Sequence, residues 1–245
     1  MATPEISNIR IREIDEHAEM RAVEELQKEV WGIPDLDVVP ATHLVATKEA
    51  GGVLIGAFDG DTLVGFVYGF PSFEHGKLAH HSHMLAVKPA YRNFDLGRRL
   101  KLAQRDHVKA QGIELISWTF DPLQSLNAHF NFNKLGVIAD LYLPNFYGED
   151  AASFLHQTGT DRLWVSWFVE GKPVAVSDHD QVAIEIPTNI DALPREIALK
   201  WRAETRRAFT EALKAGYIVE SFVRAEQFGK YLLTKNENKN SIQSS

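Results

Sequence analysis

The chain contains no cysteine among its 245 residues. This absence excludes disulfide bonds, thiolate metal sites and a cysteine nucleophile together. No apolar run is long enough to span a bilayer, and residues 1–10 lack the charged and then apolar pattern of a secretory signal. We therefore expect a cytoplasmic protein that has no membrane partner.

Positive charge is also scarce, since 26 Lys and Arg residues against 33 Asp and Glu residues give a formal net charge of −7. Proteins that coat nucleic acid normally carry a basic domain or stripe. We therefore expect no nucleic-acid partner, although a local basic pocket can still hold a small molecule that carries phosphate. The length fits one large domain, or one domain with an appended subdomain.

The order of the predicted elements indicates an α/β fold. Few strand–helix–strand repeats are present, which favours a mixed, mostly antiparallel sheet flanked by helices, with one parallel pair where strands 78–87 and 113–120 flank a crossover helix. Alternation and helical spacing predict strands at 8–14, 52–58, 62–70, 78–87, 113–120, 137–143 and 163–169, and helices at 15–31, 40–46, 95–111 and 124–135.

The turn after strand 78–87 is suited to phosphate. A strand that runs through a turn directly into a helix points unpaired backbone N–H groups, and the positive end of the helix dipole, at one spot. Arg92, Arg98 and Arg99 add charged donors able to contact a diphosphate. The competing interpretation is an ordinary helix start with arginines in solvent, and the turn alone favours that one.

Two motifs change this balance. Residues 87–97 read Val-Lys-Pro-Ala-Tyr-Arg-Asn-Phe-Asp-Leu-Gly, and residues 128–137 read Ala-His-Phe-Asn-Phe-Asn-Lys-Leu-Gly-Val. The first resembles the GNAT superfamily pattern of Pro-Ala-Tyr followed by Arg-x-x-Gly-x-Gly, and the second resembles its Ala-x-x-x-Tyr-x-Lys-x-Gly-Phe signature. With the element order, the resemblance extends from Ile9 to Val169. It implies an enzyme that transfers an acyl group from coenzyme A to an amine.

The resemblance also implies where the donor, acetyl-coenzyme A or another acyl-coenzyme A, would bind. Amides of the turn would hold the pyrophosphate, and the strand before it would pair with pantetheine. A backbone N–H near Val87 would meet the oxyanion formed during transfer. The implied coenzyme-binding residues are Leu85, Ala86, Val87, Arg92, Asn93, Phe94, Asp95, Leu96, Gly97, Arg98, Ser125 and Asn127.

His81 is the candidate catalytic base. It lies six residues before Val87, where members of the family often carry a glutamate, and an ordinary histidine titrates near neutrality. A partly exposed strand with polar histidines is an equally good interpretation of this segment. A metal site is a weaker one, because His81 and His83 share a face of the strand whereas His80 points away. We therefore expect no metal.

Three residues depart from the family pattern. Asp95 replaces the first motif glycine, and it is harmless there if it caps the helix from the side away from the ligand. Ser125 stands where an asparagine often opens the second signature, with Asn127 as a substitute. Phe132 replaces the tyrosine that protonates the departing sulfur and cannot donate a proton. Tyr142, Tyr147 or water could take that role.

The chain continues beyond the resemblance. We expect an acyltransferase domain at 1–170, an extension that packs on or lengthens the sheet at 171–235, and a flexible tail at 236–245. A strand at 181–186, a helix at 194–215 and strands at 217–223 and 231–234 repeat the order of 113–169. This predicts a second half-copy of the fold that walls the acceptor pocket, while a stabilising or dimerising lobe is the alternative.

The resulting functional hypothesis is an N-acyltransferase that moves an acetyl, or another short acyl group such as succinyl, to the primary amine of a small molecule such as an amino acid. An acid-terminated acyl group needs an added cation, for which Arg162, Arg202 and Arg206 are candidates. Phe146 and Tyr147, in a loop, are candidate acceptor contacts. The alternative function is a non-catalytic module that senses acyl-coenzyme A, and a homodimer stays open.

Overall fold

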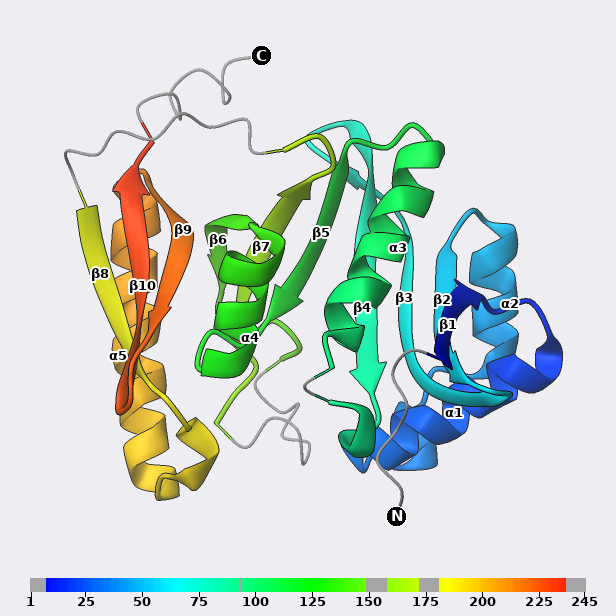
Figure 1. The fold of residues 1–245 in the computed structure, drawn as a ribbon. Helices are drawn as coiled ribbons and strands as arrows, with labels where there is room; N and C mark the ends of the chain where they lie inside the picture. Colours follow the sequence, from blue (N-terminus) through cyan, green and yellow to red (C-terminus); the bar gives the residue numbers. More distant parts are fainter. Residues whose placement is uncertain (1–7, 93, 149–157, 172–180, 237–245) are drawn as a thin grey trace. The chain divides into compact units, whose positions relative to one another are not determined.

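A computed structural model describes residues 8–92, 94–148, 158–171 and 181–236 (Figure 1). The chain forms two compact units, Met1–Ser117 and Trp118–Ser245. The expected tail lies outside the described residues except for Asn236, and the domain boundary at residue 170 stays a prediction. None of the helices in the described ranges is long and apolar enough to cross a membrane.

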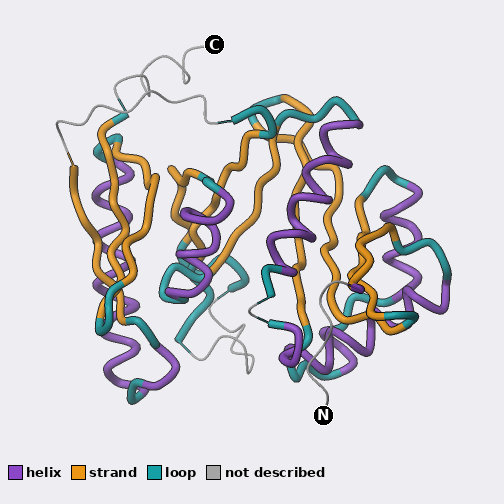
Figure 2. Tube along the Cα trace, viewed as in Figure 1, coloured by secondary structure: helices purple, strands orange, loops and turns teal. Residues whose placement is uncertain are grey.

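The first unit contains the elements that the sequence predicts for it, and Figure 2 shows its helices in purple and its strands in orange. Asp15, where the first helix is predicted to begin, lies before it and pairs with Lys48, and Glu16 precedes the helix without a side-chain capping bond. The elements are β1 (Ile9–Glu13), α1 (His17–Trp31), α2 (Ala41–Glu49), β2 (Val53–Asp59), β3 (Thr62–Glu74), β4 (Lys77–Val87), α3 (Leu96–Ala110) and β5 (Leu115–Phe120), which continues into the second unit.

Strand pairing confirms the mixed sheet. β1, β2, β3 and β4 pair in that order, each antiparallel to the next. β4 and β5 form the predicted parallel pair, with α3 as the crossover between them. This connection brings the end of β4 and the start of α3 together, as a phosphate-binding turn requires.

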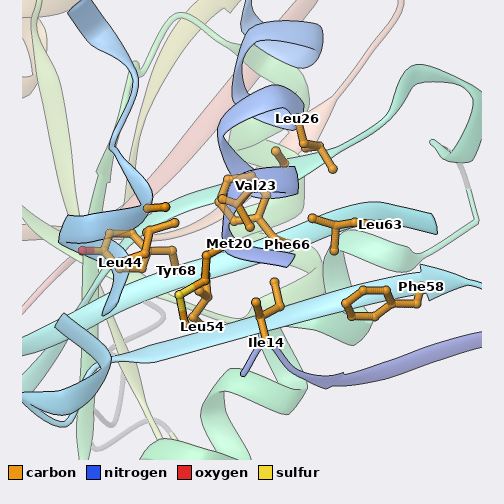
Figure 3. Packing of buried hydrophobic residues seen from close by; sticks show 12 residues of the cluster. Ile14, Met20, Val23, Leu26, Leu44, Leu54, Phe58, Leu63, Phe66 and Tyr68 are labelled. Atoms are coloured by element: carbon orange, nitrogen blue, oxygen red, sulfur yellow. The ribbon is translucent and has the colours of Figure 1, made fainter. Parts of the chain in front are cut away.

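One face of this sheet is sealed by α1 and α2. Apolar residues recur along α1 at helical spacing and contact alternate residues of β3, so that one stripe of the helix and one face of the strand exclude water together. Figure 3 shows how these side chains interdigitate; the buried cluster includes Ile14, Met20, Val23, Leu26, Leu44, Leu54, Phe58, Leu63, Phe66 and Tyr68.

The second unit is built from two similar strand–helix–hairpin segments, which confirms the predicted C-terminal element order. Its strands follow the order β5-β7-β6-β9-β10-β8. The first segment comprises the end of β5, α4 (Ser125–His129), a π-helical turn (Phe130–Leu135), β6 (Ile138–Leu143) and β7 (Arg162–Phe168). The second comprises β8 (Gln181–Pro187), α5 (Arg195–Lys214), β9 (Tyr217–Arg224) and β10 (Phe228–Lys235).

The similarity of the two segments extends to single residues. Each hairpin follows a glycine in the left-handed region, Gly136 with φ 73° and Gly216 with φ 88°. Pairing of β6 with β7 skips Asp140, and pairing of β9 with β10 skips Glu220, which is the fourth residue after the glycine in both cases. β6 and β9 are antiparallel to each other with Ala139 opposite Val219, the third residue after each glycine. The two segments are therefore related by an approximate twofold axis.

Arginines of α5 tie the two segments together. Arg202 Nη2 donates to Asp121 Oδ2 at 2.6 Å, and Arg206 Nη2 donates to Asp161 Oδ1 at 2.6 Å. Tyr142 also donates to Asp161, whose side chain is fully buried. Burial alone would raise the pKa of the Asp161 carboxyl, but the hydrogen bonds from Arg206 and Tyr142 lower it. Asp161 therefore stays charged inside the unit.

The buried pair of Arg202 and Asp121 yields a stability prediction. Arg202→Met should cost about 3–5 kcal/mol of unfolding free energy, because it leaves the carboxylate of Asp121 without its counter-charge. Arg207→Met on the same helix is the matched control, since Arg207 makes an exposed pair with Glu211 and should cost no more than about 1 kcal/mol. Urea unfolding measures both, and equal costs would contradict the prediction.

Candidate active site

β4 carries the candidate base and is hydrogen-bonded unevenly along its two edges. Its pairing with β3 runs from Lys77 to Val87, whereas its pairing with β5 within the first unit comprises only His80↔Ile116 and His81↔Ser117. On the edge away from β3, Leu85–Val87 have no strand partner among the residues that the structure describes in this unit. Backbone N–H and C=O groups in such an edge can pair with an extended ligand.

β4 contains a β-bulge close to the candidate base. Tyr68 lies opposite Met84 and Gly69 opposite Ser82, so His83 is an extra residue on β4. The bulge bends the strand two residues after His81. Sequence reasoning predicted the strand but missed this bulge, because nothing in the local residue types distinguishes it.

The histidines of β4 lie on both faces of the sheet, as strand geometry predicts. The rings of His81 and His83 lie 5.4 and 5.6 Å from the ring of Phe70, and 6.1 Å from each other. His80 is on the opposite face, where its Nε2 is 3.2 Å from Gln104 Nε2 of α3. His80 is fully buried, His81 is half-buried and His83 is exposed.

Burial sets the protonation of these histidines. It lowers the pKa of His81 to about 4, with smaller contributions from His83 and Lys101. Burial, together with Lys101, lowers the pKa of His80 to about 3. The pKa of His83 is also lowered, by burial and by His43. Near neutral pH His81 is therefore an uncharged imidazole that can accept a proton.

The start of α3 offers free backbone donors. The N–H groups of Leu96, Gly97 and Arg98 make no backbone hydrogen bond to any residue in the described part of the chain, whereas the N–H of Arg99 donates to Asp95 O at 3.0 Å. Such N-terminal amides favour an anion, as expected for a pyrophosphate site. The N–H of Arg92 is not available, because it donates to Pro89 O.

Asp95 explains why the family pattern has glycine at its position. Its φ of 59° and ψ of 13° lie in the left-handed region, where glycine is unstrained and aspartate is among the tolerated residues. Its carboxylate does not cap the helix, since Asp95 makes no side-chain capping bond. Its Oδ2 instead accepts from Arg98 Nη1 at 3.4 Å, and both side chains are exposed. The arginine thus offsets the negative charge beside the amides.

Arg92 and Arg99 differ in whether their side chains lie near the turn and could contact a phosphate there. Arg92 Nε donates to Val87 O at 3.2 Å and the residue is exposed. Arg99 Nη2 donates to Ile9 O at 3.0 Å, so it braces β1 and is not directed at the turn as the sequence suggested. Phe94 is half-buried. Asn93 lies outside the described residues.

The remaining coenzyme candidates belong to the second unit. Ser125 begins α4 and is buried, and its Oγ has no hydrogen-bond partner in the described chain. A buried hydroxyl without a partner is costly unless a ligand or water completes it, so this position fits a coenzyme contact. Asn127 is exposed. The helix predicted at 124–135 ends in a π-helical turn that contains the second motif.

Phe132 and the two tyrosines considered as proton donors in its place differ in burial. Phe132 is buried against Phe120 and Tyr231. Tyr142 donates to Asp161 Oδ2 at 2.6 Å, and burial together with this bond raises its pKa, so it is a poor proton donor. Tyr147 is exposed beside Phe146. Of the two tyrosines considered, Tyr147 is thus the accessible one.

The three candidate cations for an acid-terminated acyl group have protein contacts. Arg202 and Arg206 are paired with Asp121 and Asp161. The guanidinium of Arg162 lies 5.1 Å from the ring centre of Tyr147. Arg202 Nη1 is buried and lacks a hydrogen-bond partner among the described residues, which leaves this nitrogen as the best placed of the set.

Asn145 shapes the loop that displays Phe146 and Tyr147. It adopts φ 48°, its N–H donates to Asp161 Oδ1 at 3.0 Å, and its Oδ1 accepts from Arg206 at 2.8 Å. The loop is therefore held by the same buried carboxylate that pairs with α5. A fixed loop with exposed aromatic rings suits the acceptor contact expected here. Trp118 and Phe120 are buried, in accordance with their prediction as core residues.

Metal chemistry receives no support from the side chains. No group of three or more His, Cys, Asp or Glu residues within the described ranges is arranged to hold a metal ion. The histidines of β4 divide between the two faces, as the strand geometry requires.

Comparison with known proteins identifies relatives of the fold. The family model described as "Acetyltransferase (GNAT) family" matches residues 14–137. The aminoglycoside 6'-N-acetyltransferase from Enterococcus faecium is 20% identical, with 67% of this chain and 99% of that one covered at a TM-score of 0.51. The ribosomal-protein-S18-alanine N-acetyltransferase from Escherichia coli is 12% identical, with 68% and 99% covered at 0.52.

A further solved structure, an aminoglycoside 6'-N-acetyltransferase complexed with coenzyme A, is 19% identical, with 67% of this chain and 99% of that one covered at a TM-score of 0.51. No curated protein matches the chain in sequence. The coverage of about two thirds of this chain leaves a substantial part without a counterpart in these structures.

The buried His80 predicts acid lability. Its folded pKa of about 3 lies below the ordinary 6.5, so between these values the unfolded chain binds a proton that the folded chain does not. The stabilisation is complete above pH 6.5 and is lost toward pH 3, at about 1.4 kcal/mol per pH unit. His80→Gln should flatten the loss of stability below pH 6.5, as urea midpoints would measure. His17→Gln, at an exposed site, is the control, and an unchanged slope in His80→Gln would refute the assignment.

Proposed function

Because the chain belongs to the GNAT family of acetyltransferases, we propose that it transfers an acetyl, or another short acyl group such as succinyl, from coenzyme A to the primary amine of a small molecule such as an amino acid. Family membership makes it an acyl-coenzyme A dependent N-acetyltransferase. The observation that supports this proposal is the start of α3, directly after β4, where the N–H groups of Leu96, Gly97 and Arg98 make no backbone hydrogen bond to any described residue.

The residues present fit an acyl-coenzyme A, which supplies an activated acyl thioester. The N–H groups of Leu96, Gly97 and Arg98 would hold the pyrophosphate, with the Arg98 guanidinium adding charge. The backbone of Leu85–Val87 would pair with pantetheine, and an N–H near Val87 would stabilise the oxyanion, a contact typically worth about 3 kcal/mol. The unpaired Ser125 Oγ and Asn127 would bind further along the arm.

His81 would act on the acceptor. The attacking amine must be neutral, and an uncharged imidazole on β4 can take its proton directly or through water. A pKa of about 4 keeps His81 unprotonated at neutral pH, although it also makes the imidazole a weak base that must pass the proton on to solvent. The amine nitrogen would bond to the thioester carbon to give the oxyanion, and its collapse would break the carbon–sulfur bond, so that coenzyme A would leave as a thiolate.

Departure of the thiolate does not require the missing tyrosine. Thiols have a pKa near 8.5, so a thiolate is a tolerable leaving group, and help from a general acid is typically worth about 10² to 10⁴ in rate. Phe132 contributes only packing at this position. Water or Tyr147 would supply the proton afterwards.

A sensor that binds acyl-coenzyme A without turnover is the second candidate function. Phe132 in place of the acid and Asp95 beside the pyrophosphate site favour it. Thioester consumption measured with and without candidate amines separates the two functions, because the sensor releases no thiol in response to an amine. Succinyl- and acetyl-coenzyme A compared side by side would settle the acyl group.

The role of residues 171–235 as an extension that walls the acceptor pocket is part of this proposal, as is the acyltransferase domain at 1–170. α5 supplies the partners of Asp121 and Asp161, so deletion of residues 181–245 would also expose or unpair these carboxylates. Substitutions in the extension, which preserve these pairs, are therefore a cleaner test of an acceptor-binding role than truncation.

We expect His81→Ala to lower kcat at least about tenfold with the affinity for acetyl-coenzyme A nearly unchanged, because it removes the base but not the backbone that binds the donor. His75→Ala, in the β3–β4 turn, is the matched control. Steady-state kinetics and calorimetric binding measure the two quantities. Unchanged turnover at neutral pH would remove His81 from the mechanism.

Donor binding should raise the thermal midpoint of the wild-type protein, because a ligand that binds only the folded state stabilises it. Arg98→Gln should reduce this rise severalfold, since it removes the charge beside the free amides and leaves Asp95 unopposed. Arg105→Gln, in the same helix, is the control. A midpoint that acetyl-coenzyme A does not shift, in the wild type, would argue against both candidate functions.

A further inference from the structure

A buried polar cluster beneath β4 has no part in the functions proposed so far. It consists of His80 and Ser82 from β4 and Lys101 and Gln104 from α3, all four of them buried. Ser82 Oγ donates to Gln104 Oε1 at 2.8 Å, and Lys101 Nζ donates to Ser82 Oγ at 2.9 Å and to Gln104 Oε1 at 3.1 Å. Gln104 thus stands at the centre of the cluster.

The side-chain amide of Gln104 determines which atoms of the cluster donate hydrogen bonds and which accept them. Its Oε1 accepts from Ser82 and Lys101, so its Nε2 faces His80 Nε2 and can only donate to it. The proton of His80 is then on Nδ1. A methionine at position 104 would have a similar length but could neither accept from Ser82 nor donate to His80.

The cluster leaves no room for a side chain at Gly69 of β3. A Cβ added to Gly69 would lie 2.4 Å from His80 Nε2, 2.6 Å from His81 O and 3.0 Å from Gln104 Nε2. Glycine is therefore required at this position by contact distance.

The position of the cluster along β4 connects it to the site. His80 and Ser82 are the residues on either side of His81, and Ser82 immediately precedes the bulge at His83. His81 itself pairs with Ser117 of β5. Gln104 therefore anchors β4 to α3 at the residues that flank His81, next to the place where the strand bends.

We propose that Gln104 is a positioning residue for acyl transfer, which holds Ser82 and His80 against α3 and thereby fixes the imidazole of His81 between them. This inference rests on the proposed function of His81. Lys101 supports the arrangement as a second donor to Ser82 and Gln104. Burial lowers the pKa of Lys101 well below its usual value.

The test is Gln104→Met in the full-length protein. We expect kcat to fall about tenfold or more, because small misplacements of reacting groups are costly, while the dissociation constant for acetyl-coenzyme A changes less than about twofold. The imidazole pKa of His81, followed by NMR, should rise from about 4 toward its ordinary value as water reaches the loosened strand. His83 and Lys101, the titratable groups that also affect the pKa of His81, are retained.

Two further variants make the test decisive. Gln111→Met is the control, because it makes the same glutamine-to-methionine change outside the cluster. Gln111 follows the end of α3 and donates to Gly51 O at an exposed site. Ser82→Ala removes one contact of Gln104 without changing α3 and should reproduce a smaller loss of kcat if Gln104→Met fails to fold. Unchanged kcat and an unchanged His81 titration in the folded variant would overturn the proposal.

Failure of the proposed function is distinguishable from failure of this inference. If the wild type transfers no acyl group to any amine, the transferase assignment falls, whereas the NMR titration of His81 in Gln104→Met still decides whether Gln104 positions it. A shifted titration would then support the structural link on its own, and an unshifted one would reject it.

Discussion

The candidate site depends on how β4 changes its hydrogen-bonding partners. The strand is paired on one edge along its whole length, yet its parallel pairing with β5 in the first unit is limited to two residues. The bulge at His83 lies two residues beyond the second of them. The proposed function requires that backbone groups near the end of the strand pair with an extended ligand. The turn and helix that follow the strand add donors for the charged end of such a ligand.

Buried polar groups are stabilised differently in the two units. In the first unit the cluster around Gln104 contains Lys101 and His80, and burial lowers the pKa of both. In the second unit the carboxylates of Asp121 and Asp161 are paired with arginines of α5. The first arrangement leaves stability sensitive to acid, whereas the second makes it sensitive to the loss of a single partner.

The sequence was sufficient for the fold. Alternation, helical spacing and glycine at the element ends placed every strand and helix in its range, because each of these signals is local. The motif at residues 87–97 likewise located the helix start with free amides. The left-handed backbone of Asp95 is consistent with the glycine of the family pattern, although its carboxylate pairs with Arg98 and does not cap the helix.

Long-range features could not be predicted in the same way. The bulge at His83, the direction of Arg99 toward Ile9 and the contact of Gln104 with His80 each join residues far apart in the chain, and no residue type announces them. The engagement of Arg202 and Arg206 by buried carboxylates was missed for the same reason. Sequence patterns identify which side chains are chemically able to bind a ligand. Only the structure shows which of them are already hydrogen-bonded or ion-paired to other protein groups.

The approximate twofold axis between β6 and β9 has a consequence for association. An uncovered β6 would present a row of unsatisfied peptide groups able to recruit the same strand from another molecule. Here the role of that second molecule is filled by a later stretch of the same polypeptide, at Val219 opposite Ala139. Because both strands belong to one chain, their pairing is intramolecular and does not depend on protein concentration.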